Sequence, residues 1–313
     1  MLFFAFYFFY KKKIMFKPFL ARPFSITSLH RYSRQIMSQQ KSSFSAACCI
    51  IGDEILNGKT RDSNAHFLAK YLFRLGIDLK RIETIPDEYD AIEETIKRLS
   101  SHHDFVFTSG GIGPTHDDIT YSALAKAFQL PLQLDKETCL RMERSAAMTY
   151  NKKPDQPQWT LTEARKRMAI FPEPSKKLRM DEKEDELLWV PVVVVNDNIH
   201  VLPGIPKLFE SLLERVVRPH LESIVFKTHP QSYHRIQIAT KLPEGEIAPF
   251  LTELQKSCQE KQIKIGSYPN WGKGKDGARV VVSVVGKDLA HVDSVSDEVL
   301  KGVGGWILEE GKL

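Results

Sequence analysis

A binding site for an anion and a cation is indicated by the stretch "FVFTSGGIGPTHDDIT", residues 105 to 120. Its glycines carry no side chain, so their backbone N–H groups can approach a bound phosphate closely, and a strand-to-helix loop directs such dipoles at an anion. Two adjacent aspartates would repel that phosphate unless a cation lies between. The stretch therefore predicts a divalent metal bridging carboxylate and phosphate. The residues concerned are Gly110, Gly111, Gly113, Asp117 and Asp118.

The stretch differs from the familiar phosphate-binding loops. It has no loop lysine, so it is not the P-loop of nucleotide triphosphatases, and the dinucleotide pattern G-x-G-x-x-G is unmatched. Gly113 and Pro114 stand where the "SGG" loop of the PP-loop enzymes continues with Asp-Ser. Two structural alternatives remain open: the glycines form only a turn, and an aspartate only caps the following helix.

Two further acidic loops follow apolar segments. "GDE", residues 52 to 54, follows the apolar run 46–51, and "PDE", residues 86 to 88, follows the segment 77–85. Helical spacing of apolar residues begins after Asp62 or Ser63, both good N-cap types, and Gly76 ends it. We expect strands at 46–51, 77–85 and 104–108, and helices at 62–75, 86–99 and 119–128.

Strands that alternate with helices predict an α/β fold, a three-layer, mostly parallel sheet with helices on both faces. In such sheets ligands bind at the carboxyl ends of the strands. All three acidic loops follow strands, so we expect them to share one rim.

The second half of the chain has a different organisation. Residues 151–186 are proline-rich and charged, which predicts a mobile, partly disordered insertion with one short helix. A hairpin around Asn196–Asn198 and the amphipathic segment 207–217 follow. Beyond His220 the order strand, helix, strand, strand, helix is typical of a small ferredoxin-like α+β domain. The expected divisions are a leader, 1–43, a catalytic domain, 44–222, and a small domain, 223–313.

Charge and cysteine content exclude several classes of protein. Of 44 Lys and Arg, eight lie in residues 1–43 without any Asp or Glu, so the remainder is slightly acidic, with 36 basic and 39 acidic side chains. That balance argues against a nucleic-acid partner. The four cysteines lack the spacing of a disulfide framework or a zinc site, which favours a reducing compartment. Cys48 and Cys49 are expected to be small buried residues in a strand.

The first forty residues have the composition of a targeting leader. The apolar run of residues 1–10 is shorter than the roughly 20 residues that span a bilayer, so no stable membrane insertion is expected. The segment 15–36 is basic, contains serine and lacks acids, which is typical of a mitochondrial transit peptide. Initiation at Met15 or Met37 is the alternative, and a start at Met37 would give a cytoplasmic protein.

Three motifs together resemble a known family. "GDEILNGKTRDSN", "TSGGIGPTHDDIT" and "LPGIP" are similar to the molybdopterin-binding-like domain of molybdopterin adenylyltransferases, of the bacterial competence-damage-inducible family and of the N-terminal half of eukaryotic FAD synthase. "RMAIFP", "WVPVVVV" and "IHVLPGIP" resemble the eukaryotic FAD diphosphatase branch. The resemblance covers about residues 44–290. It implies metal-dependent hydrolysis of the pyrophosphate bond of FAD to FMN and AMP, and also of related nucleotide diphosphate compounds such as ADP-ribose.

The resemblance also implies residue roles. Asp118 and Asp87 match the aspartates that the adenylyltransferases use around metal and phosphoanhydride, and are the expected catalytic residues. Carboxylate-held metal would supply charge neutralisation and a positioned water. The expected metal ligands are Asp53, Glu54, Asp117 and Asp118, and the expected substrate contacts are Gly52, Asn64, Gly110, Gly111, Gly113 and Thr115. The cofactor would be Mg²⁺ or a transition metal such as Co²⁺, with K⁺ a further candidate, and the protein a homo-oligomer.

Other residues and functions stay open at this stage. His116 is either a general base or phosphate contact or a solvated loop residue, Arg61 and Asn64 either contact ligand or cap a helix, and Trp271 either stacks on a ligand ring or lies in a hairpin. The alternative functions are a molybdopterin adenylyltransferase and a non-enzymatic nucleotide-binding regulator.

Overall fold

A computed structural model describes residues 43–149, 159–181, 187–228, 232–270 and 275–308. Most of the first domain is built on one six-stranded sheet with the strand order β2-β1-β3-β8-β7-β6. The first four strands of that order are parallel, and β7 and β6 are antiparallel to their neighbours. The strands are β1 (Ser45–Ile51), β2 (Asp78–Ile85), β3 (Phe105–Ser109), β6 (Lys176–Leu178), β7 (Val192–Val195) and β8 (Ile199–Leu202).

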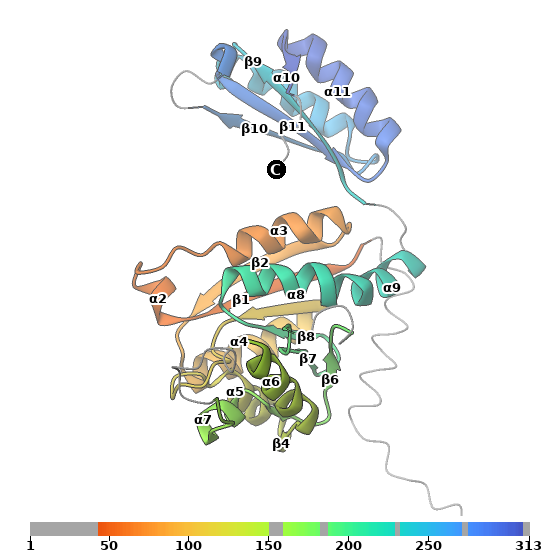
Figure 1. Ribbon diagram of the computed structural model, residues 1–313. Coiled ribbons are helices and arrows are strands. Elements are labelled where there is room, and N and C mark those ends of the chain that lie inside the picture. The colour runs from red at the N-terminus through yellow and green to blue at the C-terminus, as the bar shows by residue number, and fades with distance from the viewer. Residues whose placement is uncertain (1–42, 150–158, 182–186, 229–231, 271–274, 309–313) are drawn as a thin grey trace, which may run out of the picture. The chain divides into compact units, whose positions relative to one another are not determined.

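Helices cover both faces of this sheet, so the expected three-layer α/β fold is confirmed (Figure 1). One apolar cluster joins the sheet to α3 (Asn64–Arg74), α8 (Pro206–Leu212), the π-helical segment Leu213–Val217 and α9 (Arg218–Thr228). A second cluster joins the opposite face to α4 (Tyr89–His102) and α5 (Thr120–Phe128). The inner strand β1 is apolar on both faces because both faces are covered. Cys48 and Cys49 are fully buried in it, and burial raises the pKa of Cys49 to about 12.

Local sequence explains where α3 begins and ends. The Asp62 carboxylate accepts hydrogen bonds from the backbone N–H groups of Asn64 and Ala65, at 2.8 and 3.1 Å, so Asp62 rather than Ser63 caps the helix. Gly76, with φ +70°, follows the end of the helix in the left-handed conformation that glycine adopts at least cost. The cap places Asn64 at the edge of the sheet where the acidic loops lie.

Several elements differ from the sequence expectation. The "GDE" loop is a single helical turn, α2 (Asp53–Leu56), and α4 begins only at Tyr89. The expected insertion contains α7 (Glu163–Arg167) but also two strands, β6 and β5 (Ile170–Pro172). β5 pairs with β4 (Leu132–Leu134), and α6 (Lys136–Thr149) follows β4. The proline and charge content of the segment did not predict these strands, because each has only three residues and forms only by pairing with a neighbouring strand.

The C-terminal domain is a separate antiparallel sheet with the order β10-β11-β9-β12. Its elements are β9 (His234–Thr240), α10 (Glu244–Ser257), β10 (Lys264–Pro269), the 3₁₀ turn Lys275–Gly277, β11 (Val280–Gly286), α11 (Leu289–Val303) and β12 (Trp306–Ile307). The element order βαββαβ and this strand order are those of a ferredoxin-like fold, which confirms the sequence expectation. No helix in the described ranges is long and apolar enough to cross a membrane.

Candidate functional site

The loops that follow β1, β2, β3 and β8 meet at one edge of the main sheet. The N–H of Gly52 donates to Ile85 O at 3.1 Å, and the N–H of Gly110 donates to Leu202 O at 3.2 Å. The backbone N–H of Asp53 donates to the carboxylate of Asp87 at 2.9 Å. The three acidic loops therefore share one rim, as the strand order requires.

The glycine loop needs glycine for steric reasons at its first position. Gly110 has φ +114°, and a Cβ there would lie 2.0 Å from the carbonyl oxygen of Ile51. The loop backbone thus packs directly on the end of β1. Gly204, in the "LPGIP" segment, also packs on Gly110, since a Cβ on it would lie 3.4 Å from the Cα of Gly110.

Asp118 binds the glycine loop itself. Its carboxylate accepts hydrogen bonds from the N–H of Gly113 at 2.6 Å, the N–H of Thr115 at 2.9 Å and the hydroxyl of Thr115 at 2.5 Å. The N–H groups of Gly113 and Thr115, which the sequence assigned to substrate, are thus used within the loop. Asp118 gives the loop its shape, a function that the motif alone did not indicate.

Asp87 is the carboxyl group of the rim whose pKa is raised. Burial raises its pKa, and the negative charges of Asp53, Glu54 and Asp117 raise it further, although the hydrogen bond from Asp53 N opposes them. Four carboxyl groups therefore act on one another at this edge. Such excess negative charge favours a bound cation, and oxygen ligands suit Mg²⁺.

The predicted metal ligands are not gathered into a coordinating group. Among the residues that the structure describes, no set of three His, Cys, Asp or Glu side chains is arranged to hold a metal ion. Asp53, Glu54 and Asp117 are exposed to solvent, and Asp118 is committed to the loop. A cation held by these residues stays a prediction, supported here by charge and donor chemistry.

One basic residue whose charge acts on the rim was missed by the sequence argument. The pKa of Asp117 is lowered by hydrogen bonding within its own loop, and also by the positive charges of His116 and Arg167. Arg167 ends α7, so the segment 159–181 carries a positive charge that acts on Asp117. The only sequence signal was the run "RKR" at residues 165–167. The His116 side chain is 97% exposed and lies 4.0 Å from Asp117, which favours the solvated-loop interpretation.

Asn64 joins three segments of the rim. It is buried, and its side-chain amide donates to Ser109 Oγ and to Gly204 O, each at 2.9 Å. Its Oδ1 is buried and has no hydrogen-bond partner within the described structure. Asn64 therefore positions the ends of β3 and β8. Arg61 is exposed, and Trp271 lies outside the described residues.

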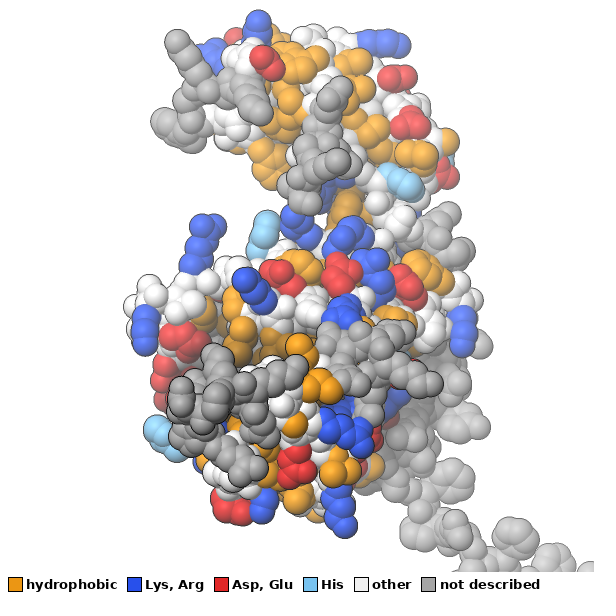
Figure 2. Space-filling model, in the orientation of Figure 1, with side chains coloured by type: hydrophobic (Ala, Val, Ile, Leu, Met, Phe, Trp, Pro, Cys, Tyr) orange, Lys and Arg blue, Asp and Glu red, His pale blue; other side chains and the backbone are white. Residues whose placement is uncertain are grey.

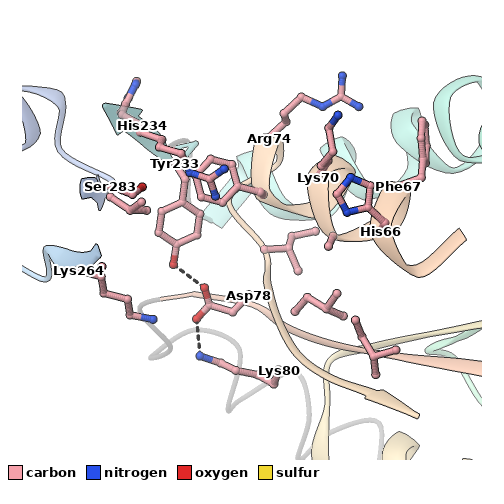
Figure 3. A pocket seen from close by; sticks show the side chains of 18 of the residues that line it. His66, Phe67, Lys70, Arg74, Asp78, Lys80, Tyr233, His234, Lys264 and Ser283 are labelled. Atoms are coloured by element: carbon pink, nitrogen blue, oxygen red, sulfur yellow. Dashed lines mark hydrogen bonds and ion pairs between the residues drawn. The ribbon is translucent and has the colours of Figure 1, made fainter. Parts of the chain in front are cut away.

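A cavity of about 2000 Å³ lies away from this rim, and none of the predicted site residues lines it (Figure 3). Its wall includes the exposed side of α3 and the first half of β2, and blue Lys and Arg side chains gather over α3 and α8 (Figure 2). Asp78 accepts hydrogen bonds from the Tyr233 hydroxyl at 2.5 Å and from Lys80 at 2.7 Å. The cavity exceeds the roughly 300–1,000 Å³ of small-molecule pockets, and the chemistry of the sequence motifs lies elsewhere.

Comparison with known proteins finds two domains. The model of a "Probable molybdopterin binding domain" matches residues 47–223, and that of "FAD synthase, middle domain" matches residues 232–310. A "Probable FAD synthase" of Caenorhabditis briggsae is 34% identical over 230 residues, 72% of this chain and 43% of that protein. That of Caenorhabditis elegans is 34% identical over 249 residues, 74% of this chain and 44% of that protein. The chain thus spans less than half the length of these two relatives.

Smaller relatives match over most of their own length. A protein of Aeropyrum pernix is 31% identical over 272 residues, 83% of this chain and 95% of that protein. The crystal structure of CinA from Thermoplasma acidophilum, described as of unknown function, is 28% identical and covers 56% of this chain and 96% of its own, with a TM-score of 0.46.

Proposed function

The chain belongs to the molybdopterin-binding-domain family and also matches the middle domain of FAD synthase, and from this premise we propose that it hydrolyses the pyrophosphate bond of FAD to FMN and AMP. The observation that carries the proposal is the rim itself. A loop with backbone N–H donors lies beside four carboxyl groups. Burial raises the pKa of one of them, Asp87, and the charges of the other three, Asp53, Glu54 and Asp117, raise it further. The backbone N–H donors would bind the phosphoanhydride, and the carboxylates would bind its counter-cation.

In this proposal the glycine loop binds one phosphate, and the raised pKa of Asp87 suits it to accept a proton. A water oxygen bonds to one phosphorus atom while the bridging P–O bond breaks, so that one product leaves with the bridging oxygen. The proton of the water passes to Asp87. FMN and AMP each retain one phosphate.

A divalent cation such as Mg²⁺ or Co²⁺, held by oxygens of Asp53, Glu54, Asp117 or Asp118, would neutralise the charge of the pyrophosphate and position the water. K⁺ is a further candidate at the same rim. Asp118 would contribute whatever lone pairs its three loop hydrogen bonds leave available. The positive charge of Arg167, which lowers the pKa of Asp117, would offset part of the phosphate charge.

The decisive experiment is incubation of the purified chain with FAD, ADP-ribose or NADH under Mg²⁺ or Co²⁺, with and without K⁺. Release of AMP and FMN is followed by chromatography, with a chelator as the metal-free control and Asp87→Asn as the inactive control. We expect AMP from FAD in the metal-containing reactions only. Absence of AMP from every substrate and metal would overturn the proposal. Transfer of AMP from ATP to a pterin phosphate would instead support the adenylyltransferase alternative.

We also propose import into mitochondria, on the composition of residues 1–43 alone. A basic leader without acids is drawn toward the negative matrix side by about 2.3 kcal/mol per charge per 100 mV. Fusion of residues 1–44 to a fluorescent reporter tests it, together with sequencing of the native N-terminus. A diffuse reporter and a native start at Met37 or Ser38 would show a cytoplasmic protein.

A further inference from the structure

Thr120 holds two successive carbonyl groups of the glycine loop. It is fully buried as the first residue of α5. Its hydroxyl donates to Gly110 O at 3.0 Å, and its backbone N–H donates to Gly111 O, also at 3.0 Å. One residue thus fixes the orientation of two neighbouring peptide groups.

Because the peptide bond is planar, the direction of each carbonyl group also fixes the direction of the N–H group that follows it. In a trans peptide the C=O and the following N–H point in opposite directions. Because Thr120 holds the carbonyls of Gly110 and Gly111, the N–H groups of Gly111 and Ile112 point away from Thr120. Two adjacent N–H groups held on one side form the kind of concave donor pair that binds anions.

Of the four N–H groups of residues 110–113, these two have no acceptor in the described structure. Within the described structure, Gly110 N donates to Leu202 O, and the N–H groups of Gly113 and Thr115 donate to Asp118. No acceptor is recorded there for the N–H of Gly111 or Ile112, and both residues are partly exposed. A ligand that enters the loop therefore meets these two N–H groups.

Resting on the proposed function, we propose that the N–H groups of Gly111 and Ile112 bind one phosphate of the dinucleotide substrate, and that Thr120 is the positioning residue that fixes them. Thr120 touches neither substrate nor cation. Its removal should weaken phosphate binding far more than it slows the bound reaction. The sequence pattern did not single out this threonine, because its position follows from contacts across the loop.

The test uses an isosteric substitution. Thr120→Val keeps the shape and the backbone hydrogen bond but removes the hydroxyl, so Gly110 O loses its donor. We expect KM for FAD and the Kd for FAD, measured by flavin fluorescence without metal, to rise about tenfold, the equivalent of about 1.4 kcal/mol, with kcat reduced less than threefold. Thr120→Ser restores the hydroxyl and should return both values to within about threefold of wild type.

Thr108→Val is the matched control. Thr108 is fully buried at the end of β3, and its hydroxyl has no hydrogen-bond partner in the described structure. The same substitution there should leave KM and Kd unchanged. If Thr120→Val melts early, Thr120→Ala at lower temperature serves as the second variant, with the same expected rise. Wild-type KM and Kd in the Thr120 variants would overturn the proposal.

A second probe separates this inference from the proposed function. Inorganic pyrophosphate is titrated into wild type and Thr120→Val by calorimetry, without any turnover. Binding that weakens in the variant supports the loop assignment even if the wild type does not cleave FAD. Equal binding to both proteins contradicts the assignment even if the wild type does cleave FAD.

Discussion

The side-chain amide of Asn64, at the start of α3, donates a hydrogen bond of 2.9 Å to the carbonyl oxygen of Gly204, 140 residues further along the chain. The same amide donates to Ser109 Oγ, so one buried side chain connects a helix start with the ends of two strands. The acceptor Gly204 packs on Gly110, and the contact therefore reaches the glycine loop. Asn64 acts on the loop through this chain of contacts.

We expect Asn64→Asp to weaken the site and the fold together. The aspartate cannot donate, so the buried Ser109 Oγ and the partly buried bond to Gly204 O lose their donor, at a cost of about 1–3 kcal/mol in the free energy of unfolding. KM for FAD should rise at least about fivefold. Chemical denaturation and steady-state kinetics measure the two effects. Asn57→Asp is the control, because exposed Asn57 only accepts a bond from Lys59 N, which aspartate can also accept.

Gly111→Val should abolish FAD binding. Gly111 has φ +63°, which β-branched residues avoid, and its Cβ would lie 2.3 Å from Thr120 Oγ1. The substitution would displace the hydroxyl that orients the loop. Flavin fluorescence measures the loss. Gly245→Val, at a helical glycine with open space and no positive φ, should bind FAD as wild type does; unchanged affinity in Gly111→Val would mean that the loop is only a turn.

Asp118→Ala and Asp53→Ala should each abolish hydrolysis without unfolding the protein. Asp118→Ala leaves the N–H groups of Gly113 and Thr115 without their acceptor, and solvent can replace it at this partly exposed site. Asp53→Ala removes an exposed carboxylate and keeps the backbone N–H that binds Asp87. A thermal melt beside the AMP assay decides the matter. Near wild-type turnover of either variant at saturating metal would contradict the assignment.

Asp87→Asn should separate activity from stability. The raised pKa of Asp87 means that its charged form destabilises the folded protein at neutral pH, so the neutral amide should leave the melting temperature equal or higher. The amide oxygen still accepts from Asp53 N, while hydrolysis is lost.

Asp78→Asn is the opposite case. Burial raises the Asp78 pKa, but hydrogen bonds from Lys80 and Tyr233 outweigh it and lower the value overall, so the charged form stabilises the fold. This variant should melt below wild type. A lower melting temperature for Asp87→Asn than for Asp78→Asn would show that the charge balance of the rim is misassigned.

His200 should make the protein sensitive to acid. Burial lowers its pKa from 6.5 to about 3, with further lowering from the neighbouring His220 and Lys176, while hydrogen bonds with Asn198 and Val106 oppose the shift. Below pH 6.5 the unfolded chain therefore binds a proton that the folded protein does not. The free energy of unfolding should fall by up to about 1.4 kcal/mol per pH unit between these values.

His200→Phe should make that fall shallower between pH 6.5 and 4, because the ring already packs on Phe105 and Phe107. Urea denaturation at several pH values measures it. The exposed His66→Gln is the control and should follow wild type. An identical pH dependence in His200→Phe would assign the acid sensitivity to other groups.

The sequence by itself determined the α/β order, the ferredoxin-like order of the second domain and the meeting of the acidic loops at one rim. These follow from local physics: apolar runs predict buried strands, helical spacing predicts helices, and parallel strands end at the same edge. The glycines and aspartates could be identified because their chemistry depends on residue type.

Only the tertiary structure decided how those residues are used. It assigned Asp118 to the loop amides, Asn64 to two strand ends and Thr120 to two carbonyls, and it lets the charge of Arg167 act on Asp117. Each assignment is a choice among hydrogen-bond partners, and a side chain of given type can serve any of them. The choice depends on which groups the packed sheet brings within about 3 Å, and residue type and spacing do not contain that information.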